Sequence, residues 1–111
     1  MAAYYSQLPQ VFGALSDPTR LAVVVQLLEG PASVSDLAEP HAMARQSFMK
    51  HLAVLESSGV VTSKKNGRVR TVALRKAALA HVEDWARSHR QRIESDLDRL
   101  GDFLSKEHEN E

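Results

Sequence analysis

The chain has 111 residues, of which 43% are hydrophobic and 25% charged, and its 14 basic and 14 acidic side chains give a formal net charge of zero. This length predicts a single domain, and the complete absence of cysteine excludes disulfides, thiolate metal sites and cysteine redox chemistry. No apolar run reaches the roughly 18 residues that a membrane helix needs, and the N-terminus lacks the pattern of a signal peptide, so we expect a cytoplasmic protein without membrane contacts.

Two amphipathic helices are predicted at the start of the chain. The first is expected over residues 5–14, and its apolar side carries Leu8, Val11 and Phe12. The second begins after Asp17, because an Asp side chain caps free helix amides and the following Pro18 lacks the amide hydrogen that would be unpaired there. We expect it to run to Glu29, before Gly30-Pro31. The apolar residues expected to form its buried stripe are Leu21, Val24, Val25 and Leu28.

A short third helix and a longer fourth helix follow. Ser33 is expected to cap the third over residues 34–39. The fourth, at about residues 44–57, repeats apolar residues at the spacing of one helical face, namely Phe48, Leu52 and Leu55, with Val54 at the edge of that face. Gly59 then ends the helix, since glycine accepts a left-handed cap without steric cost. The other side of this helix, toward its start, presents Arg45, Gln46, Ser47, Met49, Lys50 and His51.

A β-hairpin is predicted over about residues 60–74. Asn66-Gly67 is a strong signal for a two-residue turn, because a mirror-image turn needs positive φ at both central positions. After the turn, polar and apolar residues alternate, so we expect one face of the ribbon to pack and the other to be cationic. The cations assigned to this hairpin are Lys64, Lys65, Arg68 and Arg70.

The zero net charge conceals an uneven distribution. Residues 45–76 carry eight Lys or Arg against Glu56 alone, a net charge of +7, whereas residues 1–44 have −3 and residues 77–111 have −4. A basic helix and hairpin of this kind predict a winged helix-turn-helix fold, mainly α with a small β-hairpin, that binds double-stranded DNA.

Within this prediction, the fourth helix reads bases and the hairpin contacts the DNA backbone. Arg or Lys pairs with guanine and Gln with adenine, which makes Arg45, Gln46 and Lys50 the candidate readers. Met49 could pack or contact a thymine methyl group. His51 lies at the boundary of the exposed face, where reading and positioning are both open.

A long last helix is predicted at about residues 76–105. A helix of about 30 residues is about 45 Å long, more than one small domain can cover, so we expect a second protomer to pack on it. We therefore predict a homodimer joined through this last helix, with Trp85 as a core or interface anchor. Beside Trp85, the predicted interface contains Leu79, Val82, Ala86, His89, Ile93, Leu97, Leu100 and Leu104.

Residues 8–104 resemble the ArsR/SmtB family of bacterial transcriptional repressors. The resemblance is carried, in this order, by Asp17-Pro18-Thr19-Arg20, Lys50-His51-Leu52-Ala53-Val54-Leu55, Gly59-Val60-Val61 and Gly67-Arg68. It implies a homodimer joined by the first and last helices, which adds Leu8, Val11 and Phe12 of the first helix to the predicted interface. The resemblance also implies that the dimer binds an inverted-repeat operator and blocks transcription, usually until an inducer releases it. The inducer of this chain would be an unknown small molecule.

Two departures from the family argue against a metal site. Ser33-Val34-Ser35-Asp36-Leu37 stands where many metal-sensing members have Cys-Val-Cys-Asp-Leu, and hydroxyls are poor ligands for soft metals. On the last helix, His81 and Glu83 would be followed by Glu94 and Leu97, and Leu97 cannot ligate. We therefore expect neither metal nor cofactor.

Three other functions compete with that of a DNA-binding repressor. A zinc or nickel sensor would use His and carboxylate ligands of the last helix, and a winged-helix module could bind protein instead of DNA. The +7 segment argues against the protein-binding module. An enzyme is not expected, because the chain has no Ser/His/Asp arrangement in a loop context and no glycine-rich phosphate loop.

Overall fold

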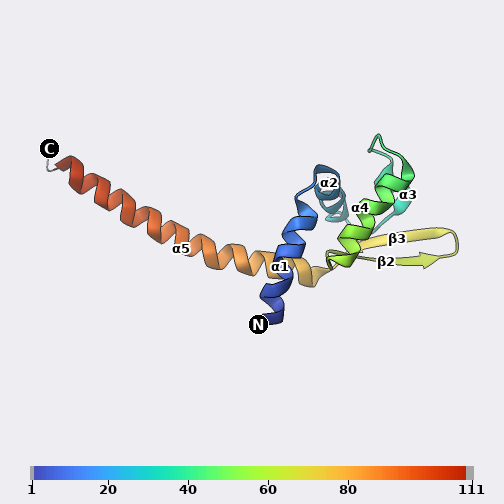
Figure 1. Ribbon diagram of the computed structural model, residues 1–111, viewed down its shortest axis with the longest axis horizontal. Helices are drawn as coiled ribbons and strands as arrows, with labels where there is room; N and C mark the ends of the chain where they lie inside the picture. The colour runs from blue at the N-terminus through green and yellow to red at the C-terminus, as the bar shows by residue number, and fades with distance from the viewer. Residues whose placement is uncertain (1, 110–111) are drawn as a thin grey trace. The chain divides into compact units, whose positions relative to one another are not determined.

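The computed structural model describes residues 2–109 and the side chains of residues 7–107. Within these residues the helices and strands follow one another as α1 (Ala2–Leu15), α2 (Pro18–Leu27), β1 (Ala32–Ser33), α3 (Val34–Ala38), α4 (Arg45–Ser57), β2 (Val61–Asn66), β3 (Val69–Leu74) and α5 (Lys76–Glu109) (Figure 1). The chain divides into two compact units after Leu79, and the second consists of α5 from Ala80 onward. No helix within the described residues is long and apolar enough to cross a membrane.

The predicted helix caps are confirmed. The Asp17 carboxylate accepts hydrogen bonds from the backbone amides of Thr19 at 2.8 Å and Arg20 at 3.0 Å, which fixes the start of α2. The Ser33 hydroxyl accepts from the Asp36 amide at 3.1 Å and begins α3. Both helices end slightly earlier than predicted, whereas α1 is longer at both ends than its predicted range.

The prediction for the buried face of α2 was largely wrong. The structure buries Val23, Val24 and Leu27, whereas Leu21, Val25 and Leu28 are 46%, 56% and 62% exposed. The reason is that residues 21–28 are apolar almost all around the helix, so that helical spacing alone fits two different faces. An apolar stripe consequently remains on the outer side of α2.

The wing belongs to a sheet of three strands, not two. All pairings are antiparallel in the order β1-β3-β2, and the short β1 pairs Ala32 with Val72. The turn is also shifted by one residue from the prediction. Asn66 pairs with Val69, so the central residues are Gly67 and Arg68, and only Gly67 has positive φ, at 64°. A hairpin turn with positive φ at its first central position alone requires glycine only there.

The core holds α4 in a fixed orientation. Phe48, Leu52 and Leu55 are at most 5% exposed, as predicted, whereas Val54 remains 38% exposed. After Ser58 the chain turns at Gly59, whose φ of 81° agrees with the predicted left-handed cap. The turn leads directly into β2, so that α4 lies beside the β2–β3 hairpin (Figure 1). The side chains with the least exposure are Val23, Leu37, Phe48, Leu55, Val60 and Val72.

Candidate nucleic-acid interface

The side of α4 opposite the core carries the side chains predicted to read bases. Arg45, Gln46, Ser47 and Lys50 are exposed and Met49 is half-buried. A shallow hollow is lined by Arg45, Gln46, Met49, Lys50 and Ala53. Ala44 occupies the N-cap position without a side-chain hydrogen bond, so the first amides of α4 keep their donors. This face combines charged donors, an amide and an apolar side chain on a rigid helix, which is the chemistry that recognises base edges.

His51 lies within a polar network that joins α4 to the start of the chain. The Arg20 guanidinium is 3.1 Å from His51 Nδ1 through Nη1, and it donates through Nε to the Ala14 carbonyl at 2.7 Å. These two contacts hold the Arg20 side chain between the His51 ring and the end of α1. Of the two roles left open for His51, this geometry favours positioning.

The same network affects Asp17. Its carboxylate lies 3.6 Å from His51 Nδ1. The hydrogen bond from the Arg20 amide contributes most to lowering the pKa of Asp17, with smaller contributions from His51 and the Thr19 amide, against an opposing contribution from desolvation. Asp17 therefore remains ionised at neutral pH, where it caps α2 and faces α4.

The cations of the hairpin do not share one face, in contrast to the prediction. Lys65 pairs with Arg70, and both lie on the face that contains the buried Val72, whereas Lys64 pairs with Thr71 on the opposite face. Arg68 occupies the turn. The predicted alternation breaks at Thr71, after which the apolar positions change face. The hairpin thus presents cations on both faces and at its tip.

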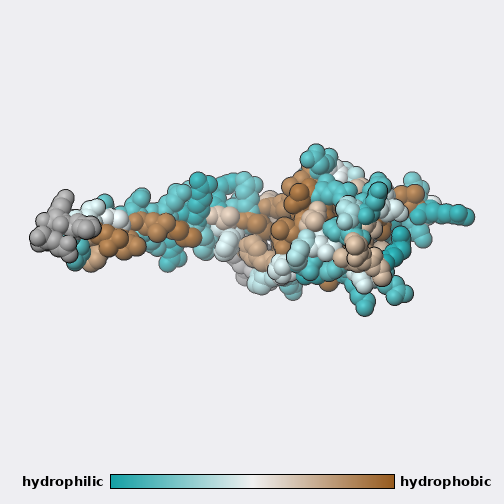
Figure 2. Space-filling model, turned by 90° about the horizontal axis from the view of Figure 1, so that it is seen from above, coloured by the Kyte–Doolittle hydropathy of each residue, from teal (hydrophilic) through white to brown (hydrophobic). Residues whose placement is uncertain are grey.

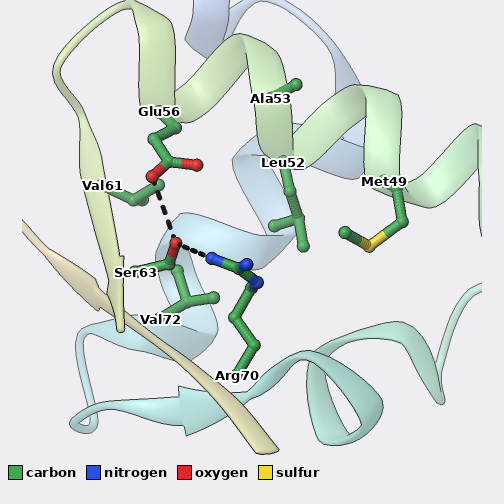
Figure 3. A pocket seen from close by; sticks show the side chains of 8 residues that line it. All are labelled: Met49, Leu52, Ala53, Glu56, Val61, Ser63, Arg70 and Val72. Atoms are coloured by element: carbon green, nitrogen blue, oxygen red, sulfur yellow. Dashed lines mark hydrogen bonds between the residues drawn. The ribbon is translucent and has the colours of Figure 1, made fainter. Parts of the chain in front are cut away.

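Arg70 points back toward α4, as Figure 3 shows. Its Nη1 donates to the Ser63 hydroxyl at 2.9 Å, and that hydroxyl donates to Glu56 Oε1 at 3.1 Å. The three side chains form part of the wall of a hollow of about 230 Å³ between α4 and the sheet, whose other lining residues are Met49, Leu52, Ala53, Val61 and Val72.

Sequence reasoning included Arg70 but missed Glu56 and Ser63. A signal was present, because Ser63 and Arg70 stand an even number of residues from Val61 and Val72, which face the core.

The predicted interface residues differ in their burial. Leu8 and Val11 are buried, while Phe12, Leu79, Val82 and Trp85 are half-buried. Those further along α5 are exposed, namely Ala86, His89, Ile93, Leu97, Leu100 and Leu104, together with Phe103, which was not predicted. Figure 2 shows these apolar side chains following one another along α5. The Trp85 ring stacks on His89 with centroids 4.7 Å apart, and His89 Nδ1 lies 2.9 Å from the Trp85 carbonyl oxygen.

Within the part of the chain that the structure describes, no group of three or more His, Asp or Glu side chains is arranged to hold a metal ion. His41, in the loop before α4, stacks on Phe48 with ring centroids 5.6 Å apart. This contact attaches the loop before α4 to the core.

Comparisons with known proteins agree with this geometry. A family profile described as a helix-turn-helix domain matches residues 15–64. The transcriptional regulator NmtR of Mycobacterium tuberculosis is 32% identical over 88 residues, which cover 79% of this chain and 73% of NmtR. The transcriptional repressor SmtB of the same species is 33% identical over 73 residues, 66% of this chain, and the chain spans about half of that repressor's length, 54%.

A solved structure gives a stronger match. The crystal structure of an ArsR family transcriptional regulator superimposes with a TM-score of 0.75 and 49% sequence identity, covering 81% of this chain and 93% of that one. Similarity of this extent reaches well beyond the helix-turn-helix segment. The chain belongs to the ArsR/SmtB family of winged helix-turn-helix transcriptional regulators.

Proposed function

We propose that the chain is a homodimeric repressor that binds an inverted-repeat DNA operator through α4 and the β2–β3 hairpin. The observation that carries the proposal is the exposed row of Arg45, Gln46 and Lys50 on a helix whose opposite face is anchored in the core. A rigid helix of this kind fits the major groove, and only side chains held in register can discriminate bases there.

The surrounding charge supports DNA as the partner. Residues 45–76 carry eight of the chain's 14 Lys or Arg residues, and they include the whole of α4 and the hairpin. Phosphate contacts by such cations supply affinity without sequence information. We assign this role to Lys64, Lys65 and Arg68, while Ser47, Met49 and His51 support the reading face from α4.

The dimer is proposed to form through α1 and α5. Several large apolar side chains of α5 stay half-exposed in the single chain, among them Ile93 and Leu97 at 56% and 59%. A second copy that covers them would also present two α4 helices to two half-sites about one helical turn apart. Release by an inducer would then act on this dimer, and a small molecule is the class of inducer we propose.

The test begins by selecting bound duplexes from a random pool, which yields the operator. Arg45→Ala, Gln46→Ala and Lys50→Ala are then titrated with operator and scrambled duplexes. Loss of a base-reading side chain should weaken operator binding by about fivefold to 150-fold, with little change on the scrambled duplex. Lys106→Ala removes a cation from the exposed end of α5 and serves as the control.

The salt dependence separates the hairpin from the helix. Lys64→Ala should weaken both duplexes alike and flatten the slope of log K against log salt by about one unit. If all three α4 variants keep the ratio of operator to scrambled affinity, α4 is not the reader and the proposed function is wrong.

A further inference from the structure

The carboxylate of Glu56 lies among the basic residues of α4 and the hairpin, on the surface that we propose binds phosphate. Glu56 is the only acidic residue in residues 45–76, and its side chain is exposed near the C-terminal end of α4. It stands three residues after Ala53 and seven after Met49, so it continues the face that we propose faces DNA. There its charge would repel phosphate and lower affinity for every duplex.

The contacts of Glu56 suggest what offsets this repulsion. Its Oε1 accepts from the Ser63 hydroxyl at 3.1 Å, and that hydroxyl accepts from Arg70 Nη1 at 2.9 Å (Figure 3). The hydroxyl has one proton, which goes to Glu56, and a lone pair receives the guanidinium donor, so Ser63 links the two charged groups. The chain of hydrogen bonds joins α4 to both strands of the hairpin.

This arrangement restricts a side chain that would otherwise be mobile. An exposed Arg loses rotamer entropy when it is fixed. Here Ser63 and Glu56 hold the guanidinium beside α4 before DNA arrives, and one hydrogen bond occupies only one of its five N–H donors. The remaining donors can reach a base edge or a phosphate close to Met49 and Ala53.

We propose that Arg70 is a specificity-determining residue that acts with α4, and that Ser63 and Glu56 are its positioning residues. This inference rests on the proposed DNA-binding function and refines it: one hairpin arginine contributes to sequence discrimination, whereas Arg68, at the turn, supplies affinity alone. The guanidinium has the geometry to bind guanine through two parallel hydrogen bonds.

Ser63→Ala provides the sharpest test, because it breaks the link without changing charge. In titrations at one fixed ionic strength, we expect it to lower the ratio of operator to scrambled affinity about threefold to tenfold, with scrambled binding unchanged. Ser57→Ala removes another α4-region hydroxyl, which donates to the Val54 carbonyl, and should leave both affinities unchanged. If Arg70 is an ordinary backbone cation, Ser63→Ala should also change nothing, and that result overturns the inference.

Arginine variants give a matched comparison. Arg70→Ala should lower the affinity ratio about tenfold, whereas Arg68→Ala should weaken both duplexes alike. In an Arg70→Ala background, Ser63→Ala should have no further effect, because the group that it positions is gone. Glu56→Gln should tighten scrambled binding through the loss of repulsion while the ratio falls.

The outcomes distinguish this inference from the function on which it rests. If the Arg45, Gln46 and Lys50 variants reduce discrimination but Arg70→Ala behaves like Arg68→Ala, only the role of Arg70 is refuted. If the α4 variants also leave discrimination unchanged, the proposed function itself fails.

Discussion

The exposed apolar side of α5 gives a quantitative prediction for assembly. Its large apolar residues are between 51% and 59% exposed in the single chain, namely Ile93, Leu97, Leu100, Phe103 and Leu104. Complete burial of a Leu side chain contributes about 1.5–3 kcal/mol, so covering the half of Leu97 that is still exposed should contribute about 1 kcal/mol. A twofold dimer contains the residue twice, which makes the loss in Leu97→Ala about 2 kcal/mol per dimer.

This loss corresponds to a rise of about 30-fold in the dimer dissociation constant. Leu97→Asp should have a larger effect and yield monomer, because the interface would enclose a carboxylate without a partner. Sedimentation equilibrium over a range of concentrations measures both constants. Circular dichroism checks that α5 remains helical, and weakened association should also weaken operator binding.

Asp98→Ala is the matched control, because it changes an exposed neighbour of Leu97 that lies outside the apolar row. It should leave the dimer constant within about twofold. The reasoning is refuted if Leu97→Asp sediments as a folded dimer with the dissociation constant of the unmodified chain. The apolar row of α5 would then not be the dimer interface.

Other predictions test the core, a turn, an ionised cap and the absence of metal control. Phe48→Ala should lower the free energy of unfolding by about 3–5 kcal/mol in urea titrations, because the side chain is 1% exposed. Gly59→Ala should cost about 1–2 kcal/mol in the same assay, since its φ of 81° is unfavourable for a Cβ atom and no neighbouring atom lies within 4 Å to clash. The pKa of Asp17 is lowered in the folded state. Its contribution to stability is therefore complete above the ordinary pKa of an Asp and is lost as the pH falls through the pKa of Asp17 in the folded protein. Asp17→Asn should consequently make the urea midpoint less sensitive to acid. Zinc, nickel or arsenite should change the affinity for operator less than tenfold, and a larger change would show coupling of more than about 1.4 kcal/mol.

Sequence patterns that are compatible with only one local structure were predicted correctly. Asp17-Pro18 could only begin a helix in that context, and the caps by Asp17 and Ser33 were found at hydrogen-bond distance. Gly59 has the positive φ that its place after α4 required. The stripe of Phe48, Leu52 and Leu55 was predicted correctly because Gln46, Lys50 and Ser57 lie opposite it on α4.

Sequence patterns that are compatible with two local structures could not be decided from the sequence alone. In α2 the run of apolar residues fits either Val24 with Leu28 or Val23 with Leu27, and only packing against the other helices selects the second. The two residues of β1 are too few to show a period of two. At the turn, Asn66-Gly67 and Gly67-Arg68 are both compatible with a two-residue loop, and the register of β2 on β3 selects the second.

In the candidate site, too, one feature could be predicted from the sequence and another depends on packing. The exposed face of α4 followed from its buried face, but the direction of Arg70 depends on which hairpin face meets α4. Residue spacing puts Ser63 and Arg70 on the same face as Val61 and Val72, but it does not bring Glu56 to them. The hydrogen bonds from Arg70 through Ser63 to Glu56 depend on how α4 packs on the hairpin.

The stacking of Trp85 on His89 provides an intrinsic fluorescence signal for self-association. Trp85 is the only tryptophan in the sequence, and its ring is half-buried next to the exposed apolar row of α5. The indole ring lies against the His89 imidazole, with ring centroids 4.7 Å apart. The fluorescence of Trp85 should therefore change when a second helix covers this ring pair. Self-association can thus be followed in unlabelled protein, at concentrations too low for sedimentation.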